Sequence, residues 1–166
     1  MDIIRKRRSI RKFTSQKVEE KDLHKILEAA MCAPSAGNQQ PWQFIVVTDQ
    51  EARTRLSKTG PYTHMAAEAP VLIIVLGDLN RETHKDYWPI DCSAATQNIL
   101  LEATSLGLGS VWLGVHPRPE RKAYISEIFE LPEHIIPFAI ICIGYGAEEK
   151  GPSERFDTTR IHYEKW

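Results

Sequence analysis

Apolar residues follow two patterns along the chain, a helical period and short continuous runs. Near the N-terminus, Leu23, Ile26, Leu27 and Ala30 recur at i, i+3, i+4 and i+7, which predicts a helix with one apolar face. Four continuous apolar runs are instead typical of buried strands. The first run, "FIVV", is too apolar for an exposed face, so we expect a central strand there. The four predicted strands are 44–47, 70–76, 110–115 and 137–145.

The segments between these strands carry helical patterns. Short helices are predicted at 50–58 and 62–69. A longer helix is predicted from Asp91 to Leu106, with small residues that allow close packing and with Gly107 just after its end. Another helix follows Pro119. Strands interspersed with helices predict an α/β sandwich, with the helices covering the sheet.

Length and charge restrict the classes of protein that this chain can belong to. Its 166 residues fit one domain, with 42% apolar residues, 26% charged residues and a formal net charge of −1. A balanced charge gives no overall attraction to nucleic acid or to a membrane surface. The run that ends at Asp78, "APVLIIVLG", is shorter than the roughly 18 residues of a spanning helix. The N-terminal sequence turns basic at once, so we expect a cytoplasmic protein.

Several common sites are not indicated. The three cysteines, Cys32, Cys92 and Cys142, form no CxxC pair, which argues against a disulfide framework and a zinc site and predicts three buried thiols; we expect no metal. The glycine cluster from Gly107 to Gly114 departs from G-x-G-x-x-G and follows a helix, so a nicotinamide Rossmann fold is not indicated.

Six basic residues are concentrated between Arg5 and Phe13, in "RKRRSIRKF". Guanidinium groups pair with two phosphate oxygens at a time, and the hydroxyl of Ser9 can add a neutral hydrogen bond, so the cluster suits a phosphate-bearing ligand. One alternative is the solvated basic face of a helix. Nucleic-acid binding is a weaker alternative, because the patch is short and the sequence pI is about 6.6.

The last twenty residues form a polar, loop-like tail that still carries apolar side chains, among them Phe156, Ile161 and Trp166. These side chains have no evident place on their own domain. We expect the tail, about 147–166, to wrap around a second subunit; docking on its own domain is the alternative.

Several short motifs follow one another along nearly the whole chain. "RRSIRKF" is followed about one helix later by "APSAGNQQPWQFIVV". This pair resembles the nitroreductase family of flavin enzymes, and so do the segments after it. "DCSAATQNILLEATSLGLGSVWLG" resembles the family's central helix and the strand after it, and "LPEHIIPFAIICIGYG" its last core strand. The closing "RFDTTRIHYEKW" resembles the end of the family's short members.

The resemblance implies an α+β fold with a mainly antiparallel sheet of about four to five strands, built as an intertwined homodimer with exchanged C-terminal arms. It also implies FMN at the dimer interface, with the helix from Asp91 as the main seam. Arg7 would meet the phosphate, Ser9 the ribityl chain and Arg11 the N1/O2 edge of the ring. The implied FMN-binding residues are Arg7, Arg8, Ser9 and Arg11, with the C-terminal Arg160 closing on the phosphate, Trp112, Leu113 and Gly114 near N5, and Pro34, Ser35, Ala36, Gly37, Asn38 and Gln40 from the other subunit.

In this light, the stretch from Ala33 to Trp42 suits the wall of a flat ring with polar edges. Its two prolines limit backbone freedom, Gly37 permits unusual dihedral angles, and Asn38 and Gln40 offer donor and acceptor groups. The alternative is a purely structural role, in which this stretch is a helix-to-strand turn and Trp42 is buried in the core.

The activity implied by the resemblance is a ping-pong transfer of hydride from NADH or NADPH, through flavin N5, to a nitroaromatic, a quinone or a similar small acceptor. Arg11 would be the catalytic residue, because its charge stabilises reduced flavin. The alternative is an FMN-binding or flavin-handling protein without this turnover, or a divergent family chemistry such as flavin fragmentation or reductive dehalogenation.

The sequence departs from the family pattern in two respects. Ala36 stands where members often have serine, and the long insertion over the active site is missing. Residues around 60–66 or 81–90 could cover the pocket instead.

Overall fold

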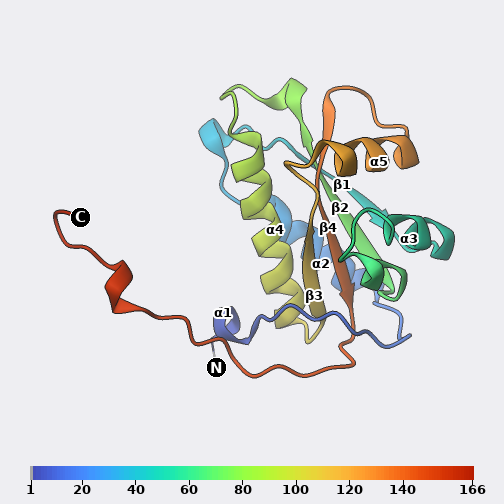
Figure 1. Ribbon diagram of the computed structural model, residues 1–166, viewed down its shortest axis with the longest axis horizontal. Helices are drawn as coiled ribbons and strands as arrows, with labels where there is room; N and C mark the ends of the chain where they lie inside the picture. Colours follow the sequence, from blue (N-terminus) through green and yellow to red (C-terminus); the bar gives the residue numbers. More distant parts are fainter. Residues whose placement is uncertain (1) are drawn as a thin grey trace.

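A four-stranded antiparallel sheet forms the centre of the computed structural model, which describes residues 2–166 (Figure 1). The strand order is β1-β2-β4-β3, so β2 and β4 are central and β1 and β3 are the edges. All three neighbouring pairs are antiparallel, with one irregularity between Val75 and Leu76 where β2 meets β4. The strands are β1 (Trp42–Val47), β2 (Val71–Asp78), β3 (Gly109–Gly114) and β4 (Ile135–Gly144).

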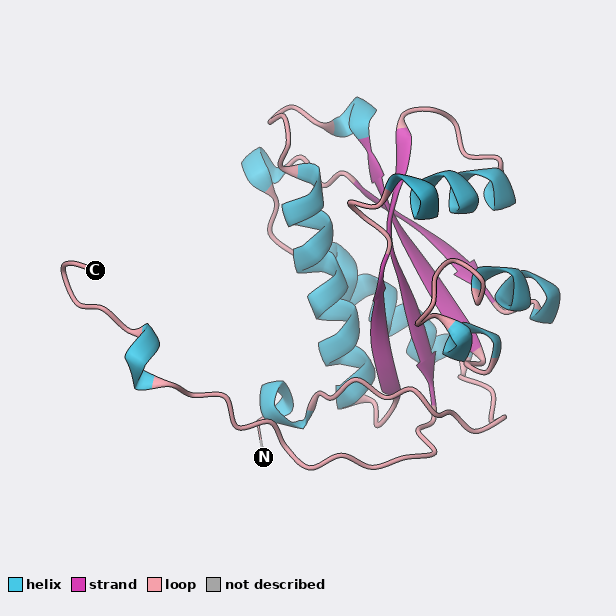
Figure 2. Ribbon diagram, viewed as in Figure 1, coloured by secondary structure: helices cyan, strands magenta, loops and turns pink. Residues whose placement is uncertain are grey.

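Helices cover both faces of the sheet, because successive strand residues point to opposite faces and both sets are apolar (Figure 2). On one face, helices α2 and α4 pack on residues such as Ile73 and Ile141. On the other face, α3 and α5 pack on residues such as Ile74 and Ile140. The helices are α1 (Ile3–Lys6), α2 (Glu20–Met31), α3 (Gln50–Leu56), α4 (Trp88–Ser105) and α5 (Pro119–Phe129).

Four single turns of 3₁₀ helix complete the secondary structure of the described residues. Two of them matter for the site, η1 (Ala36–Asn38) and η3 (Leu79–Arg81). The others are η2 (His64–Ala67) and η4 (Thr158–Arg160).

The predicted elements are all present, with three corrections. The strand expected to be central at 44–47 is part of the edge strand β1, and Val46 is exposed. The helix expected at 62–69 is only the turn η2. Helix α4 begins at Trp88, one turn before Asp91, because Pro89 is favoured in the first turn of a helix and does not end it.

Two of the three cysteines are buried as predicted. Cys92 and Cys142 are fully enclosed, and desolvation, followed by the charge of Asp91, raises the pKa of the Cys92 thiol to about 12. The prediction was wrong for Cys32, which is exposed at the C-terminal end of α2.

Beyond Ser153, whose backbone N–H donates to the Arg5 carbonyl oxygen at 3.1 Å, the C-terminal segment extends away from the body of the protein, as the red end of the chain in Figure 1 shows. Phe156 and Tyr163 are exposed to 83% and 82%, and Trp166 is fully exposed. For these exposed side chains, the alternative of docking on their own domain is therefore not what this structure contains. None of the described helices is both long enough and apolar enough to span a bilayer.

Candidate functional site

The basic cluster lies in an extended segment beside the edge strand β3. Helix α1 ends at Lys6, so the alternative of a basic helix face is wrong for the residues that follow. Ser9 forms a parallel bridge with Ser110 of β3, and the backbone N–H of Ile10 donates to the Ser110 carbonyl oxygen at 2.9 Å. Pairing with the sheet thus fixes the backbone that carries the arginines.

The guanidinium of Arg7 lies within electrostatic reach of two others, those of Arg8 and Arg155. Desolvation lowers the pKa of Arg7, and the positive charges of Arg155 and then Arg8 lower it further. None of the three makes an ion pair within residues 2–166. Like charges held together without a carboxylate are unfavourable by themselves, so the cluster has the chemistry of an anion site.

Glu148 and Lys150 hold the basic segment from the other side. A carboxylate oxygen of Glu148 accepts from the backbone N–H of Arg11 at 2.6 Å, and the Lys150 ammonium donates to the Ser9 carbonyl oxygen at 2.6 Å. The hydrogen bond from the Arg11 backbone is the main reason why the pKa of Glu148 is lowered, with Lys150 contributing further. The acidic residue therefore contacts the Arg11 backbone, and the Arg11 side chain stays exposed.

The loop between α2 and β1 has an unusual backbone. Gly37, Asn38 and Gln40 all have positive φ, at 53°, 57° and 48°, a region that costs energy for residues with a side chain. The hydroxyl of Ser35 accepts from the backbone N–H of Gln40 at 3.0 Å, and the Gln40 amide donates to the Asn38 side-chain oxygen at 2.9 Å. This conformation keeps Gly37 and Asn38 exposed at the tip of the loop. Trp42 is buried, as the structural alternative expected, so the loop is both a constrained turn and an exposed polar edge.

Two buried residues that the sequence analysis did not select hold this loop. The Gln39 amide nitrogen donates to a carboxylate oxygen of Asp91 at 2.6 Å, and the other oxygen accepts from the Ala36 backbone N–H at 2.9 Å. Gln39 and Asp91 are 7% and 3% exposed. The sequence did contain a signal for Asp91, as a lone acid in the otherwise apolar and small-residue start of α4. Nothing in the sequence distinguished Gln39 from its neighbour Gln40.

The predicted contact segment on β3 lies two to four residues beyond Ser110. Trp112 is half-buried and its ring centroid is 5.6 Å from that of Phe138. Leu113 points into the core, and Gly114 is exposed, with its carbonyl oxygen accepting from Arg121 at 2.6 Å. Backbone, the small Gly114 and the accessible part of Trp112 are therefore available to a ligand at the end of this strand.

A single chain brings some of the predicted residues together and keeps others apart. Ser9 pairs with Ser110 of β3, which lies opposite Ile143 of β4. The loop enters β1 at Trp42, which lies opposite Gly77 of β2 and so at the level of Ile136 of β4. These levels are roughly 23 Å apart at ~3.3 Å per residue, and the two segments are also on opposite edges of the sheet. Figure 1 shows α1 at one end of α4 and the light-blue turn η1 at the other. One protomer therefore holds the two halves of the predicted site at opposite corners.

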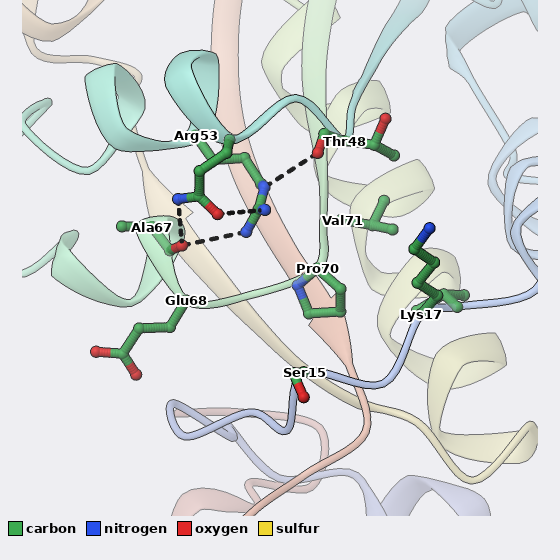
Figure 3. A pocket seen from close by; sticks show the side chains of 10 residues that line it. Ser15, Lys17, Thr48, Arg53, Ala67, Glu68, Pro70 and Val71 are labelled. Carbon is green, nitrogen blue, oxygen red and sulfur yellow. Dashed lines mark hydrogen bonds between the residues drawn. The ribbon is translucent and has the colours of Figure 1, made fainter.

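A hollow of about 640 Å³ lies elsewhere, between the N-terminal segment and the strand ends of β1 and β2 (Figure 3). None of the predicted site residues lines it. The guanidinium of Arg53, which lines the hollow, already donates to the carbonyl oxygens of Ala67 and Ala69 at 3.1 and 2.7 Å and to the Gln50 side chain at 2.7 Å. The hollow is therefore not the predicted cofactor site.

The two arginines of the C-terminal segment have different surroundings. Arg155 is close enough to Arg7 to lower its pKa. Arg160, the residue predicted for the phosphate, pairs with Asp157 at 3.1 Å and is exposed. In this conformation the arginine near the basic segment is Arg155, which the sequence analysis did not select.

Comparison with known proteins places these features in a family. The nitroreductase family profile matches residues 4–59 and 57–145. A protein of Methanothermobacter thermautotrophicus named "Putative NADH dehydrogenase/NAD(P)H nitroreductase" is 49% identical over all of this chain and 87% of its own length. The crystal structure of a "Putative NADH Oxidase" from Clostridium acetobutylicum has a TM-score of 0.97 and 46% identity, covering 99% of this chain and all of the other. An FMN-dependent nitroreductase from Clostridium difficile has a TM-score of 0.93 and 35% identity, covering 99% and 98%.

The chain belongs to the nitroreductase family. Both the family and the α+β fold with an antiparallel sheet, predicted from the order of short motifs, are confirmed.

Proposed function

We propose that the protein is an FMN-dependent oxidoreductase that takes electrons from NADH or NADPH and passes them to a nitroaromatic, a quinone or a similar small acceptor. The observation that carries the proposal is the cluster of Arg7, Arg8 and Arg155, three guanidiniums without a carboxylate partner in the described chain. The FMN-dependent nitroreductase from Clostridium difficile, which this chain matches over nearly its full length, supports FMN as the anion.

The residues present fit FMN. A terminal phosphate would neutralise the cluster at Arg7, with Arg155 and Arg8 as further donors. Ser9 stands next along the extended segment and would face the ribityl chain. Arg11, whose guanidinium is exposed, would lie at the N1/O2 edge of the ring, where a positive charge stabilises the reduced cofactor.

The second half of the site would come from a second copy of the chain. The loop Pro34–Gln40 is too far from the basic segment in one protomer, so its exposed edge would border the ring bound by the partner. Apolar side chains near the ends of α1, α2 and α4 are exposed, namely Ile4, Met31 and Ile90 at 61%, 56% and 62%, and a dimer would cover them. The tail was predicted from about 147 to 166, and its part beyond Arg155 would dock on the partner, where its aromatic side chains would be buried.

When bound, FMN supplies the hydride chemistry, and the protein supplies binding, orientation and charge. The backbone of Trp112–Gly114 would lie along the ring, since Gly114 has no side chain and no atom within 4 Å of a Cβ built there. The stiff loop with its positive-φ residues would exclude water from one side of the ring, while the other side admits the nicotinamide and then the acceptor.

A flavin-handling protein without this turnover is the second candidate. One experiment separates the two candidates. The purified protein is examined for flavin absorbance and then mixed with NADH or NADPH without oxygen. Bleaching followed by reoxidation with a quinone supports the enzyme, a flavin that stays oxidised supports the carrier, and a colourless protein that binds no added FMN contradicts both.

A matched pair of variants tests the assignment of the phosphate. Arg155→Gln should weaken FMN binding at least tenfold, because it removes a charge-assisted hydrogen bond from an anion. Arg160→Gln is the matched control in the same tail. Equal losses of FMN affinity in the two variants would mean that Arg160 also contacts the phosphate. A loss of affinity confined to Arg160→Gln would overturn the assignment to Arg155.

A further inference from the structure

A single buried side chain connects the flavin-bordering loop to the segment between β2 and α4. The Gln39 side-chain oxygen accepts from the backbone N–H groups of Thr83 and His84, both at 2.9 Å. Its amide nitrogen donates to Asp91 of α4 at 2.6 Å. Three parts of the chain that are remote in sequence therefore meet at one amide, which is 7% exposed.

The polarity of this arrangement admits few other side chains. Two donors face one end of Gln39 and a carboxylate faces the other, so the side chain must accept on one side and donate on the other. Asp91 in turn uses its second oxygen to accept from the Ala36 backbone N–H at 2.9 Å. Reversing either group would leave buried donors or acceptors facing each other, which costs much more than losing an exposed hydrogen bond.

The same segment touches the loop at two further points. The imidazole of His84 lies directly over Gly37, since a Cβ built on Gly37 would come within 2.2 Å of His84 Cε1. The Arg81 guanidinium donates to the Gln40 carbonyl oxygen at 3.0 Å. Figure 1 shows the green η3 turn and the chain after it at the same end of α4 as the light-blue η1 turn.

We propose that residues 79–87 form the rim of the pocket through which the nicotinamide and the electron acceptor reach the flavin, and that Gln39 is the positioning residue that holds this rim against the loop. The role of the loop in this proposal rests on the proposed function. The hydrogen bonds of Gln39 to Thr83, His84 and Asp91, here called the lock, do not. His84 is the rim side chain closest to the loop tip, and it is exposed. Its position makes it a contact for whichever small molecule stands over the ring.

Isosteric variants test the lock without changing the packing. Gln39→Glu places a carboxylate against the carboxylate of Asp91. Asp91→Asn places two amide groups donor to donor, and if the Gln39 amide flips to avoid this, its nitrogen faces the N–H groups of Thr83 and His84. The double variant Gln39→Glu/Asp91→Asn restores every hydrogen bond and reverses only the one between the two side chains, in which residue 91 now donates. Each single variant should therefore loosen residues 79–87, and the double variant should return them to the wild-type state.

The first readout is limited trypsin digestion of the purified full-length protein, with cleavage mapped by mass spectrometry. Arg81 and Lys85 both lie in the rim and are exposed. Cleavage there should be roughly tenfold faster in each single variant than in the wild type and the double variant, because a buried unsatisfied group opposes the closed state. Equal cleavage in all four proteins would overturn the lock, and this readout requires no flavin.

The second readout is steady-state kinetics with NADH, NADPH and a quinone. Loosening the rim should raise KM several-fold in the single variants, with kcat changed less than twofold, and the double variant should recover. If cleavage follows the predicted pattern but the KM values are unchanged, Gln39 holds residues 79–87 in place, and these residues are not the rim of the substrate pocket. A colourless protein that shows the cleavage pattern and binds no added FMN would contradict the proposed function, and with it the rim, but not the hydrogen bonds of Gln39.

His84→Ala provides the test if the single variants do not fold. It removes an exposed ring and leaves the backbone N–H that binds Gln39. We expect the variant to keep its flavin absorbance and its kcat but to show a several-fold change in KM for the quinone or the nicotinamide substrate. Wild-type KM values for all three substrates would overturn the rim.

Discussion

Ile10 packs directly on Gly109, so closely that a Cβ added to Gly109 would come within 2.8 Å of Ile10 Cγ2 and 3.0 Å of its Cβ. Ile10 follows Ser9 in the arginine-bearing segment, and Gly109 is the first residue of β3. The missing side chain therefore lets the basic segment lie flat against the edge of the sheet.

Gly109→Ala should displace this segment, because the atoms it meets are near the backbone and cannot swing away. We expect the free energy of unfolding to fall by about 1–3 kcal/mol, as overpacking does, and FMN affinity to fall with it. Urea unfolding and flavin titration measure the two effects. Adding Ile10→Ala removes the clashing methyl and should make the double variant less destabilised than the sum of the two singles. Additive losses would show that the contact is not what limits this position.

Gly37→Ala combines a backbone penalty with a contact to His84. A left-handed φ of 53° costs an alanine about 1 kcal/mol, and the new methyl would also push the imidazole aside. We expect a loss of about 1–2 kcal/mol in thermal or urea unfolding. In a His84→Ala background the steric part disappears and the backbone part remains, so the loss should shrink to about 1 kcal/mol. A full loss in that background would assign the whole effect to the backbone.

His116 should make the stability of the protein sensitive to acid. Its Nδ1 is buried without a partner within residues 2–166, its ring is stacked on Phe138 and meets Trp88 edge to face, and burial, followed by the charge of Lys122, lowers its pKa. A lowered pKa means that the unfolded chain binds the proton first. The contribution is therefore fully present above the unfolded value of about 6.5 and is lost as pH falls through it toward the folded pKa.

His116→Phe keeps an aromatic ring between Trp88 and Phe138 and removes the titration. We expect the free energy of unfolding of the wild type to decrease more than that of the variant between about pH 7 and pH 5, with the variant at least as stable at pH 7. Urea unfolding at several pH values measures both curves. Parallel curves would contradict a role for His116, since all carboxylates are common to the two proteins.

The exposed side chains of the tail test the expected second subunit. In one protomer Phe156 and Ile161 are 83% and 42% exposed, so replacing both with serine should change stability by less than about 0.5 kcal/mol if the tail stays in solvent. Burial on a partner would make the loss about 2–5 kcal/mol and shift the protein toward monomer on dilution. Light scattering and thermal unfolding of Phe156→Ser/Ile161→Ser measure these effects. Unchanged mass and midpoint would contradict the docked tail.

Local patterns were sufficient to predict the elements but not their neighbours. The apolar runs located all four strands, because continuous burial requires continuous apolar sequence. The same rule misplaced β1 at the centre, since an apolar strand on an edge has the same composition as one inside. The turn at His64–Ala67 was predicted as a longer helix because its residues have helical preferences. In the structure the Thr63 hydroxyl bonds to the backbone N–H and carbonyl oxygen of Gly60, which keeps the residues before the turn in a loop.

The candidate site divides in a similar way. Arg7, Ser9 and the loop around Gly37 were selected from residue type and motif order, and their roles stay predictions. Gln39 and Arg155 were not selected, because their surroundings depend on which distant groups approach them.

The sequence by itself determined which residues are apolar and periodic, where the chain can turn and where positive charge is concentrated, because these properties are local. Only the tertiary structure decided that the basic segment pairs with β3, that the loop lies at the opposite corner of the sheet and that Gln39 connects this loop to residues 79–87. Those relationships depend on strand order and on the meeting of hydrogen-bonding groups from remote parts of the chain, which no local preference specifies.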